Sequence, residues 1–147
     1  MKTIITVSIV LFSVFVSAQK NLIYGELGGA SPLLSVNYER QFFKSSHLNF
    51  RAGLGGSPGV WNDPFIITMP VGMYFLQNMN KGNFIEVGVT KTIVLNNIDA
   101  ENFVMPHIGY RKYYANKKSF LKLTFCPILF DSDEFLPWAG ISFGKRF

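Results

Sequence analysis

Residues 22–42 of this chain, LIYGELGGASPLLSVNYERQF, decide its fold. Apolar and polar side chains alternate with a period of two on both sides of the turn-forming residues Gly29 to Pro32. This pattern predicts a β-hairpin with one apolar face and one polar face. In a soluble hairpin the apolar face would meet a protein core, whereas in a membrane barrel it would meet lipid and the polar face would line the interior. Alternation alone does not distinguish the two.

The first 18 residues have the pattern of a secretory signal peptide. Lys2 precedes an apolar run from Ile4 to Val16, and Ser17 and Ala18 are small residues suited to cleavage. The run is shorter than the roughly 20 residues that a transmembrane helix needs. We therefore expect residues 1–18 to be removed on export and residues 19–147 to form a single domain.

Few residues are suited to cofactor chemistry. The only cysteine is Cys126, and the two histidines, His47 and His107, lie far apart in the chain. A disulfide needs two cysteines, and a zinc site needs several Cys or His at short spacing. We expect Cys126 to be a small buried residue and the protein to bind no cofactor.

The alternation continues along the whole chain after the hairpin. Eight strands are predicted, at 22–28, 33–42, 48–55, 65–76, 83–95, 103–114, 119–130 and 137–147. Pro70 and Pro106 fall within strands, where we expect a bulge and an irregularity. The predicted fold class is all-β, an eight-stranded antiparallel up-and-down transmembrane β-barrel, because an even number of strands of this length can close without exposed edges.

The formal net charge of +5 conceals a polarised molecule. With the amino terminus placed in the periplasm, the periplasmic turns carry only lysines: Lys44, Lys81, Lys117 and Lys118. The outer loops carry only acids: Asp63, Asp99, Glu101, Asp131, Asp133 and Glu134. Nucleic-acid binding would require basic residues gathered on one face, so we expect no nucleic-acid partner.

Aromatic residues bracket the predicted strands at both ends. The periplasmic ends carry Phe42, Phe43, Phe75, Phe84, Tyr113, Tyr114, Phe120 and Phe147, and the outer ends carry Trp61, Phe65, Phe103, Phe130, Phe135 and Trp138. Two aromatic belts are typical of proteins that cross a bilayer. The alternative is that aromatics are common in any strand.

The mature chain resembles the small outer-membrane β-barrels of Gram-negative bacteria. The resemblance rests on the signal peptide, on Tyr24–Gly29, on Ser35–Glu39 and on the closing segment Ala139–Phe147. It implies an outer-membrane location, contact with outer-membrane lipid and lipopolysaccharide, and a monomer. It also implies that Ile141, Phe143 and Phe147 form a C-terminal signal for the barrel-assembly machinery, although Lys145 interrupts the apolar set.

Three functions are compatible with these patterns. The first is a non-enzymatic barrel that is structural or interacts through its acidic outer loops, since eight strands enclose little more than their own side chains. The second is an outer-membrane lipid-modifying enzyme, with His107 as base and Ser142 or Thr124 as its partner. The third is a soluble secreted barrel that binds a small apolar ligand, which requires the apolar face to point inward.

Two groups of charges follow from the strand register. Lys91 faces outward among apolar residues, and we expect its ammonium group to reach a lipid phosphate. The alternative is a register slip or bulge that turns Lys91 inward. The inward positions hold both signs of charge at one level, which predicts a paired ionic plug below a small open vestibule. Its members are Glu26, Glu39, Arg51, Glu86, Arg111, Lys122 and Arg146. We expect Arg146 to neighbour Glu26 where the barrel closes.

Overall fold

A computed structural model describes residues 21–42, 47–58, 65–96, 102–114, 118–129 and 135–147. They form ten strands: β1 (Asn21–Gly28), β2 (Leu34–Gln41), β3 (Leu48–Ser57), β4 (Ile66–Asn80), β5 (Asn83–Val94), β6 (Phe103–Tyr113), β7 (Ser119–Phe125), β8 (Ile128–Leu129), β9 (Phe135–Leu136) and β10 (Ala139–Arg146). No helix within these ranges is long and apolar enough to cross a membrane. The predicted signal peptide lies outside the described residues.

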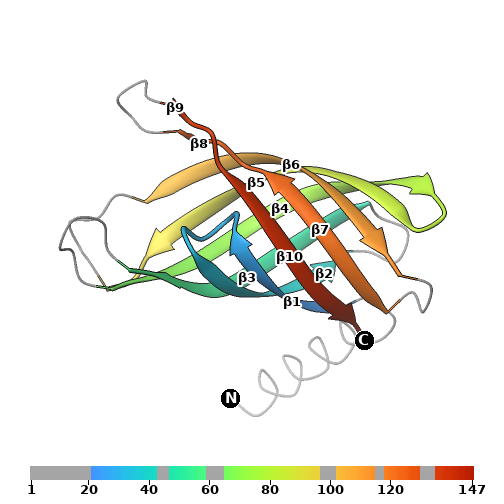
Figure 1. The fold of residues 1–147 in the computed structure, drawn as a ribbon, viewed down its shortest axis with the longest axis horizontal. Helices are drawn as coiled ribbons and strands as arrows, with labels where there is room; N and C mark the ends of the chain where they lie inside the picture. The colour runs from blue at the N-terminus through green and yellow to red at the C-terminus, as the bar shows by residue number, and fades with distance from the viewer. Residues whose placement is uncertain (1–20, 43–46, 59–64, 97–101, 115–117, 130–134) are drawn as a thin grey trace, which may run out of the picture.

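The eight long strands close into one antiparallel barrel (Figure 1). Each strand pairs with its neighbours in the order β5-β4-β3-β2-β1-β10-β7-β6, and β5 pairs with β6 to complete the circle. The predicted eight-stranded antiparallel barrel is therefore confirmed. The two-residue strands β8 and β9 pair with each other and continue β7 and β10 into a projecting hairpin (Figure 1).

The two ends of the barrel differ. At the end that we call the turn end, Lys81 and Gly82 join β4 to β5 and the chain terminates after β10. The opposite loop end carries the β1–β2 turn and the β8–β9 hairpin (Figure 1). The turn predicted at residues 77–82 is shorter than expected, because Asn80, Lys81 and Gly82 adopt φ values of 90°, 52° and 83° and reverse the chain there.

The outer wall is apolar and the inner face is polar. Val36, Leu54 and Phe143 are 60%, 61% and 59% exposed, whereas Glu39, Glu86 and Arg111 are fully buried. The soluble-barrel hypothesis required the opposite arrangement, with aliphatic side chains inside, and is wrong for this reason. Among the described residues, every Asp or Glu side chain points inward, so the exposed charged side chains are all positive.

The prolines within strands do not shift the register. Pro70 pairs with Thr92 of β5, and the β3–β4 pairing keeps one register on both sides of it. Pro106 pairs with Val89 of β5 without a shift. The bulge expected at Pro70 is therefore wrong, because a strand can lose one hydrogen bond without gaining a residue. The irregularity expected at Pro106 is confirmed on the other side of β6, where the pairing is interrupted between Val104–Leu129 and Ile108–Phe125.

Two apolar clusters fill the lumen near its ends. The turn-end cluster comprises Leu22, Tyr24 and Phe120, with Tyr113 against it. The loop-end cluster comprises Ala30, Met105, Cys126 and Ile128, with Phe103 and Trp138 against it. Four residues assigned to the aromatic belts, Phe120, Tyr113, Phe103 and Trp138, thus pack on the interior. The expectation that Cys126 is buried is confirmed.

The β1–β2 turn folds into the loop end of the lumen. Ala30 and Ser31 are 1% and 0% exposed, and the Ser31 hydroxyl is 2.9 Å from that of Thr68. The Thr92 hydroxyl donates a hydrogen bond of 2.6 Å to the Ala30 carbonyl. The predicted open vestibule is wrong, because this turn occupies the space that the small inward residues leave.

Candidate functional site: a buried ion cluster in the lumen

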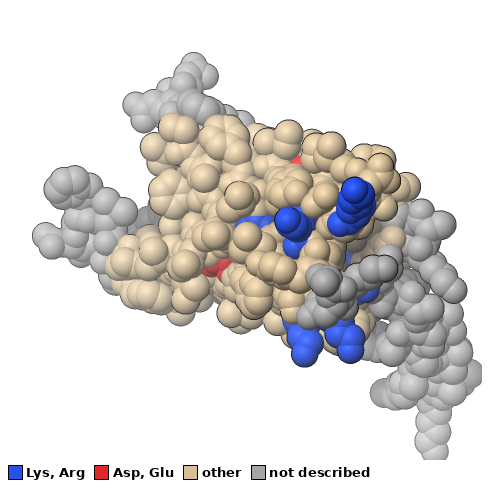
Figure 2. Space-filling view, turned by 45° about the vertical axis from the view of Figure 1, so that its right-hand side comes forward, with Lys and Arg blue, Asp and Glu red and all other residues tan. Residues whose placement is uncertain are grey.

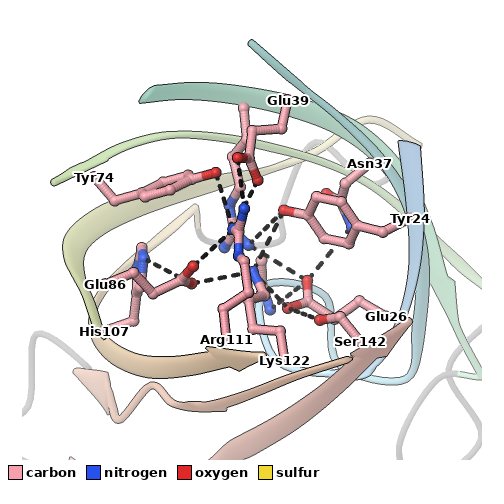
Figure 3. Close-up of polar contacts among 12 residues, drawn as sticks. Tyr24, Glu26, Asn37, Glu39, Tyr74, Glu86, His107, Arg111, Lys122 and Ser142 are labelled. Carbon is pink, nitrogen blue, oxygen red and sulfur yellow. Dashed lines mark hydrogen bonds and ion pairs between the residues drawn. The ribbon is translucent and has the colours of Figure 1, made fainter. Parts of the chain in front are cut away.

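Six charged side chains from six strands meet between the two apolar clusters (Figure 3). Each occupies an inward position of its strand, and each is at most 1% exposed. We call this set the lumen cluster: Glu26 of β1, Glu39 of β2, Arg51 of β3, Glu86 of β5, Arg111 of β6 and Lys122 of β7. Three carboxylates face three cations, so the cluster is neutral when all six are ionised.

Arg111 is the centre of the cluster. Its Nη1 and Nη2 donate to the two carboxylate oxygens of Glu39 at 2.8 and 2.9 Å, in a two-point contact. The same Nη2 lies 2.7 Å from Glu86 Oε2. Because β2 and β6 are four strands apart in either direction around the barrel, the Glu39 pair spans the lumen.

Lys122 and Arg51 complete the network. Lys122 Nζ is 3.1 Å from Glu86 Oε1 and 3.9 Å from Glu26 Oε1, and Arg51 Nη1 is 3.5 Å from Glu26 Oε2. Lys122 and Arg111 are paired in register on adjacent strands. Glu86 contacts both cations and so offsets the repulsion between them.

Neutral side chains supply further contacts to the cations. The Tyr24 hydroxyl accepts from Arg51 at 3.3 Å, and the Tyr74 hydroxyl accepts from Arg111 at 3.2 Å. Thr90 accepts from Arg51 Nη2 at 2.7 Å. The Arg111 guanidinium lies 4.8 Å from the centre of the Phe120 ring, within cation–π range.

Sequence reasoning missed these neutral partners. The alternation placed Tyr24 and Tyr74 on the inner face. A large phenol side chain among small inward residues was the one signal that these two tyrosines would contact other lumen side chains. Their partners could not be identified from the sequence, because the contacts join strands that are distant in the chain.

Glu26 connects the cluster to the β1–β2 turn. Its Oε2 accepts from the Ala30 backbone N–H at 3.4 Å and from Asn37 Nδ2 at 3.4 Å. Its Oε1 accepts from the Ser142 hydroxyl of β10 at 3.2 Å. The buried turn is thus hydrogen-bonded to the ion network below it.

Arg146 is not where the sequence placed it. Its register partner is Leu22, four residues before Glu26 on β1, and Glu26 pairs with Ser142 instead. The Arg146 guanidinium lies 5.6 Å from the Tyr113 ring at the turn end. The predicted Arg146–Glu26 proximity is wrong, because the β1–β10 register sets the two residues at different levels.

The residues considered for catalysis do not form a hydrogen-bonded pair. Ser142 donates to Glu26, and neither the His107 nitrogens nor Thr124 Oγ1 has a hydrogen-bond partner. The nearest acid to His107 is Glu86, with Nε2 and Oε1 3.9 Å apart. Within the described part of the chain, no three metal-ligating side chains lie together as a metal site requires.

The outward-facing site residues lie on the barrel wall. Lys91 is exposed and has Val71 and Val104 as its register partners. Ile141, Phe143 and Phe147 are 45%, 59% and 66% exposed, the first two on β10 and the third just after it. The six acidic residues of the predicted outer loops lie outside the described residues.

The lysines and arginines on the outer surface gather near the turn end. Figure 2 shows them as a group on one part of the molecule, with uncharged residues over most of the rest. Those with accessible side chains at this end are Arg40, Lys81, Lys112, Lys118, Lys145 and Arg146.

Comparison with known proteins supports the architecture. No family model and no curated protein matches the chain. Among solved structures, the chain is similar to the crystal structure of the N-terminal β-barrel domain of Pseudomonas aeruginosa OprF, with a TM-score of 0.52 and 15% identity. The match covers 88% of this chain and 96% of that one. At this identity the similarity shows a shared fold.

Proposed function

We propose that this chain is a non-enzymatic outer-membrane β-barrel whose lumen is closed by ion pairs. The observation that carries the proposal is the reversed polarity of the barrel, with aliphatic and aromatic side chains exposed on the outside and six charges buried inside. Such a wall in water would be a large apolar surface. In a bilayer it matches the surrounding lipid, and the closed barrel satisfies its backbone hydrogen bonds internally.

The lumen cluster argues against a diffusion pore. Eight strands enclose a space that side chains can fill, and here it holds three layers: the turn-end cluster, the lumen cluster and the loop-end cluster with the β1–β2 turn. An ion crossing the barrel would have to displace charged side chains that already have partners. We infer a structural role, or an interaction role exercised through the acidic outer loops.

Lipid is the partner to which the outer surface is suited. The exposed cations near the turn end complement the phosphates of a headgroup layer, and Lys91 lies close to the other end of β5. We infer that outer-membrane lipid contacts the turn-end group and that lipopolysaccharide contacts Lys91. We further infer that Ile141, Phe143 and Phe147 present the C-terminal strand to the barrel-assembly machinery, and that the barrel is a monomer.

Cell fractionation tests this proposal. We expect the protein in the outer-membrane fraction, extractable only with detergent, with a gel mobility that changes on boiling. Recovery in the soluble fraction without detergent would contradict it. Release of fatty acid or transfer of an acyl group by the purified protein, abolished in His107→Ala, would favour the enzyme hypothesis.

A further inference from the structure

The barrel wall has a local break between β6 and the β7–β8 segment. Val104 pairs with Leu129 and Ile108 pairs with Phe125, and the same register sets Pro106 opposite Pro127. The Cys126 N–H donates to the Trp138 carbonyl at 2.9 Å, toward β10. Because consecutive residues of a strand direct their backbone groups to opposite sides, position 127 faces β6.

Two hydrogen bonds are missing at this pair. In an antiparallel ladder, two residues whose backbone groups face each other form a hydrogen-bonded pair and exchange two N–H···O bonds. Proline has no N–H to donate. The prolines thus remove both bonds at one point of the wall. Between Val104 and Ile108 the seam has no backbone pairing in the described residues.

A depression of about 310 Å³ lies on the outer wall at this seam. Its lining is almost wholly apolar and comes from β5, β6 and β7 with the residues that follow β7: Val87, Gly88, Pro106, His107, Ile108, Phe125 and Pro127. Val87, Ile108 and Phe125 are about half exposed and belong to the apolar wall described above. The depression is therefore continuous with the surface that we assign to lipid.

Behind the break lies a buried histidine without a hydrogen-bond partner. His107 is 4% exposed, both ring nitrogens lack a partner, and the nearest carboxylate oxygen is 3.9 Å away. An imidazole ring always carries at least one N–H. A buried donor without an acceptor is unfavourable, and the carbonyl at the head of a fatty acyl chain would supply that acceptor.

We propose that the Pro106–Pro127 pair is a lateral portal, through which the acyl chain of a membrane phospholipid inserts into the wall so that its ester carbonyl reaches His107. The portal rests on the proposed membrane location, since lipid must surround the barrel. An acyl chain is the occupant because the depression is apolar, opens on the lipid-facing wall and has His107 in its lining, whose ring lies on the lumen side of the break without a hydrogen-bond partner. The strands can part at this point because the two prolines leave it without a backbone hydrogen bond.

Cys126 provides a reporter at the portal. It precedes Pro127, is buried in the loop-end cluster and is the only cysteine in the chain. The protein is inserted into phosphatidylglycerol vesicles and treated either with a long-chain N-alkyl maleimide, which dissolves in the bilayer, or with a sulfonated maleimide, which stays in water. Labelling is measured by mass spectrometry, and Cys126→Ser gives the background.

We expect the bilayer-soluble reagent to label the unmutated protein faster than the water-soluble one. The double variant Pro106→Ala with Pro127→Ala should be labelled about tenfold more slowly, as two restored hydrogen bonds imply. Pro127→Ala alone should show a smaller decrease in the same direction. Pro70→Ala, which changes a buried proline of β4 away from the seam, is the matched control and should label at the unmutated rate.

Equal labelling of the unmutated protein and the double variant would overturn the portal, as would faster labelling from water. A boiling-dependent gel shift on the same samples reports insertion, so a protein that fails to insert contradicts the membrane proposal and not the portal alone. The occupant is tested by native mass spectrometry after extraction from the vesicles. Phospholipid retained by the unmutated protein and lost in His107→Leu supports the contact, and equal retention overturns it.

Discussion

Glu39 and Arg111 meet across the lumen, with both carboxylate oxygens and both terminal guanidinium nitrogens paired at 2.8 and 2.9 Å. They lie 72 positions apart in the chain and come from strands on opposite sides of the barrel. This pair stabilises the barrel by linking opposite walls, and it also fills the lumen. The contact that joins the two walls is thus also one that the proposed closed lumen requires.

Removing Arg111 should be strongly destabilising. In Arg111→Met, Glu39 and Glu86 lose their closest cation, and breaking a buried ion pair in this way typically costs about 3 to 5 kcal/mol. The free energy of unfolding is measured by urea titration in lipid vesicles. Lys112→Met is the control, because Lys112 is the next residue and faces outward; it should change stability by less than about 0.5 kcal/mol. Equal effects of the two variants would refute the central role of Arg111.

Replacing both partners should be less harmful than replacing one. Arg111→Met leaves the buried Glu39 carboxylate without its cation, and Glu39→Leu leaves Arg111 with Glu86 as its remaining carboxylate partner, whereas the double variant removes both charges of the pair together. A double-mutant cycle should therefore give a coupling free energy of about 1 to 3 kcal/mol. Strict additivity of the two single changes would show that the pair does not interact energetically.

The β1–β2 turn should depend on Gly29. Its φ is +73°, and a Cβ there would lie 2.6 Å from the Glu26 carboxyl group. Gly29→Ala should lower the free energy of unfolding by about 1 to 3 kcal/mol, because alanine is strained at positive φ. Gly25→Ala on β1 is the control, since nothing lies within 4 Å of its added Cβ. Equal free energies of unfolding for the Gly29→Ala and Gly25→Ala variants would contradict the packing of the β1–β2 turn against Glu26.

Lys91→Leu should weaken binding to lipopolysaccharide. The Lys91 side chain starts on an apolar part of the wall and is long enough for its ammonium group to reach the headgroup phosphates. Lipopolysaccharide that co-purifies with the protein is quantified for the unmutated chain, for Lys91→Leu and for Lys112→Leu near the opposite end. We expect less co-purified lipopolysaccharide with Lys91→Leu and an unchanged amount with Lys112→Leu. Unchanged retention and unchanged stability in that variant would remove the contact.

Phe147→Ala should impair assembly in cells and leave the finished barrel intact. Phe147 is 66% exposed, and its backbone N–H bonds to the Asn21 carbonyl, a contact that alanine retains. We expect less heat-modifiable protein in the outer membrane and normal refolding of the purified variant into detergent. Normal assembly in cells would contradict a role for this residue in the assembly signal.

The sequence predicts the architecture well because alternation is a local property. Period-two patterns identified the eight strands and placed Glu39 and Arg111 on one face, since neighbouring residues alone determine which side a strand residue occupies. Shear between the strands is not local. It depends on the register around the whole barrel, and Arg146 was therefore expected to neighbour Glu26 where the barrel closes, while the register pairs it with Leu22.

The interior beyond the charges was less predictable. Ala30 and Ser31 are typical turn residues, and nothing in their pattern indicates that the turn folds back into the lumen. Gly140 permits it, because a Cβ there would lie 2.6 Å from the Gly29 Cα atom. The assignment of Phe120 to an aromatic belt failed for a related reason: its position near a strand end suggested the membrane interface, while its parity with Lys122 placed it inside.

Single-channel recording from the purified, unmutated protein in planar bilayers tests the closed lumen most directly. Insertion is verified on the same preparation by the boiling-dependent gel shift. The buried, ion-paired lumen cluster predicts no steady conductance, and Arg111→Met together with Ala30→Gly should be the variant in which current first appears. Steady channels from the unmutated protein would contradict the closed lumen.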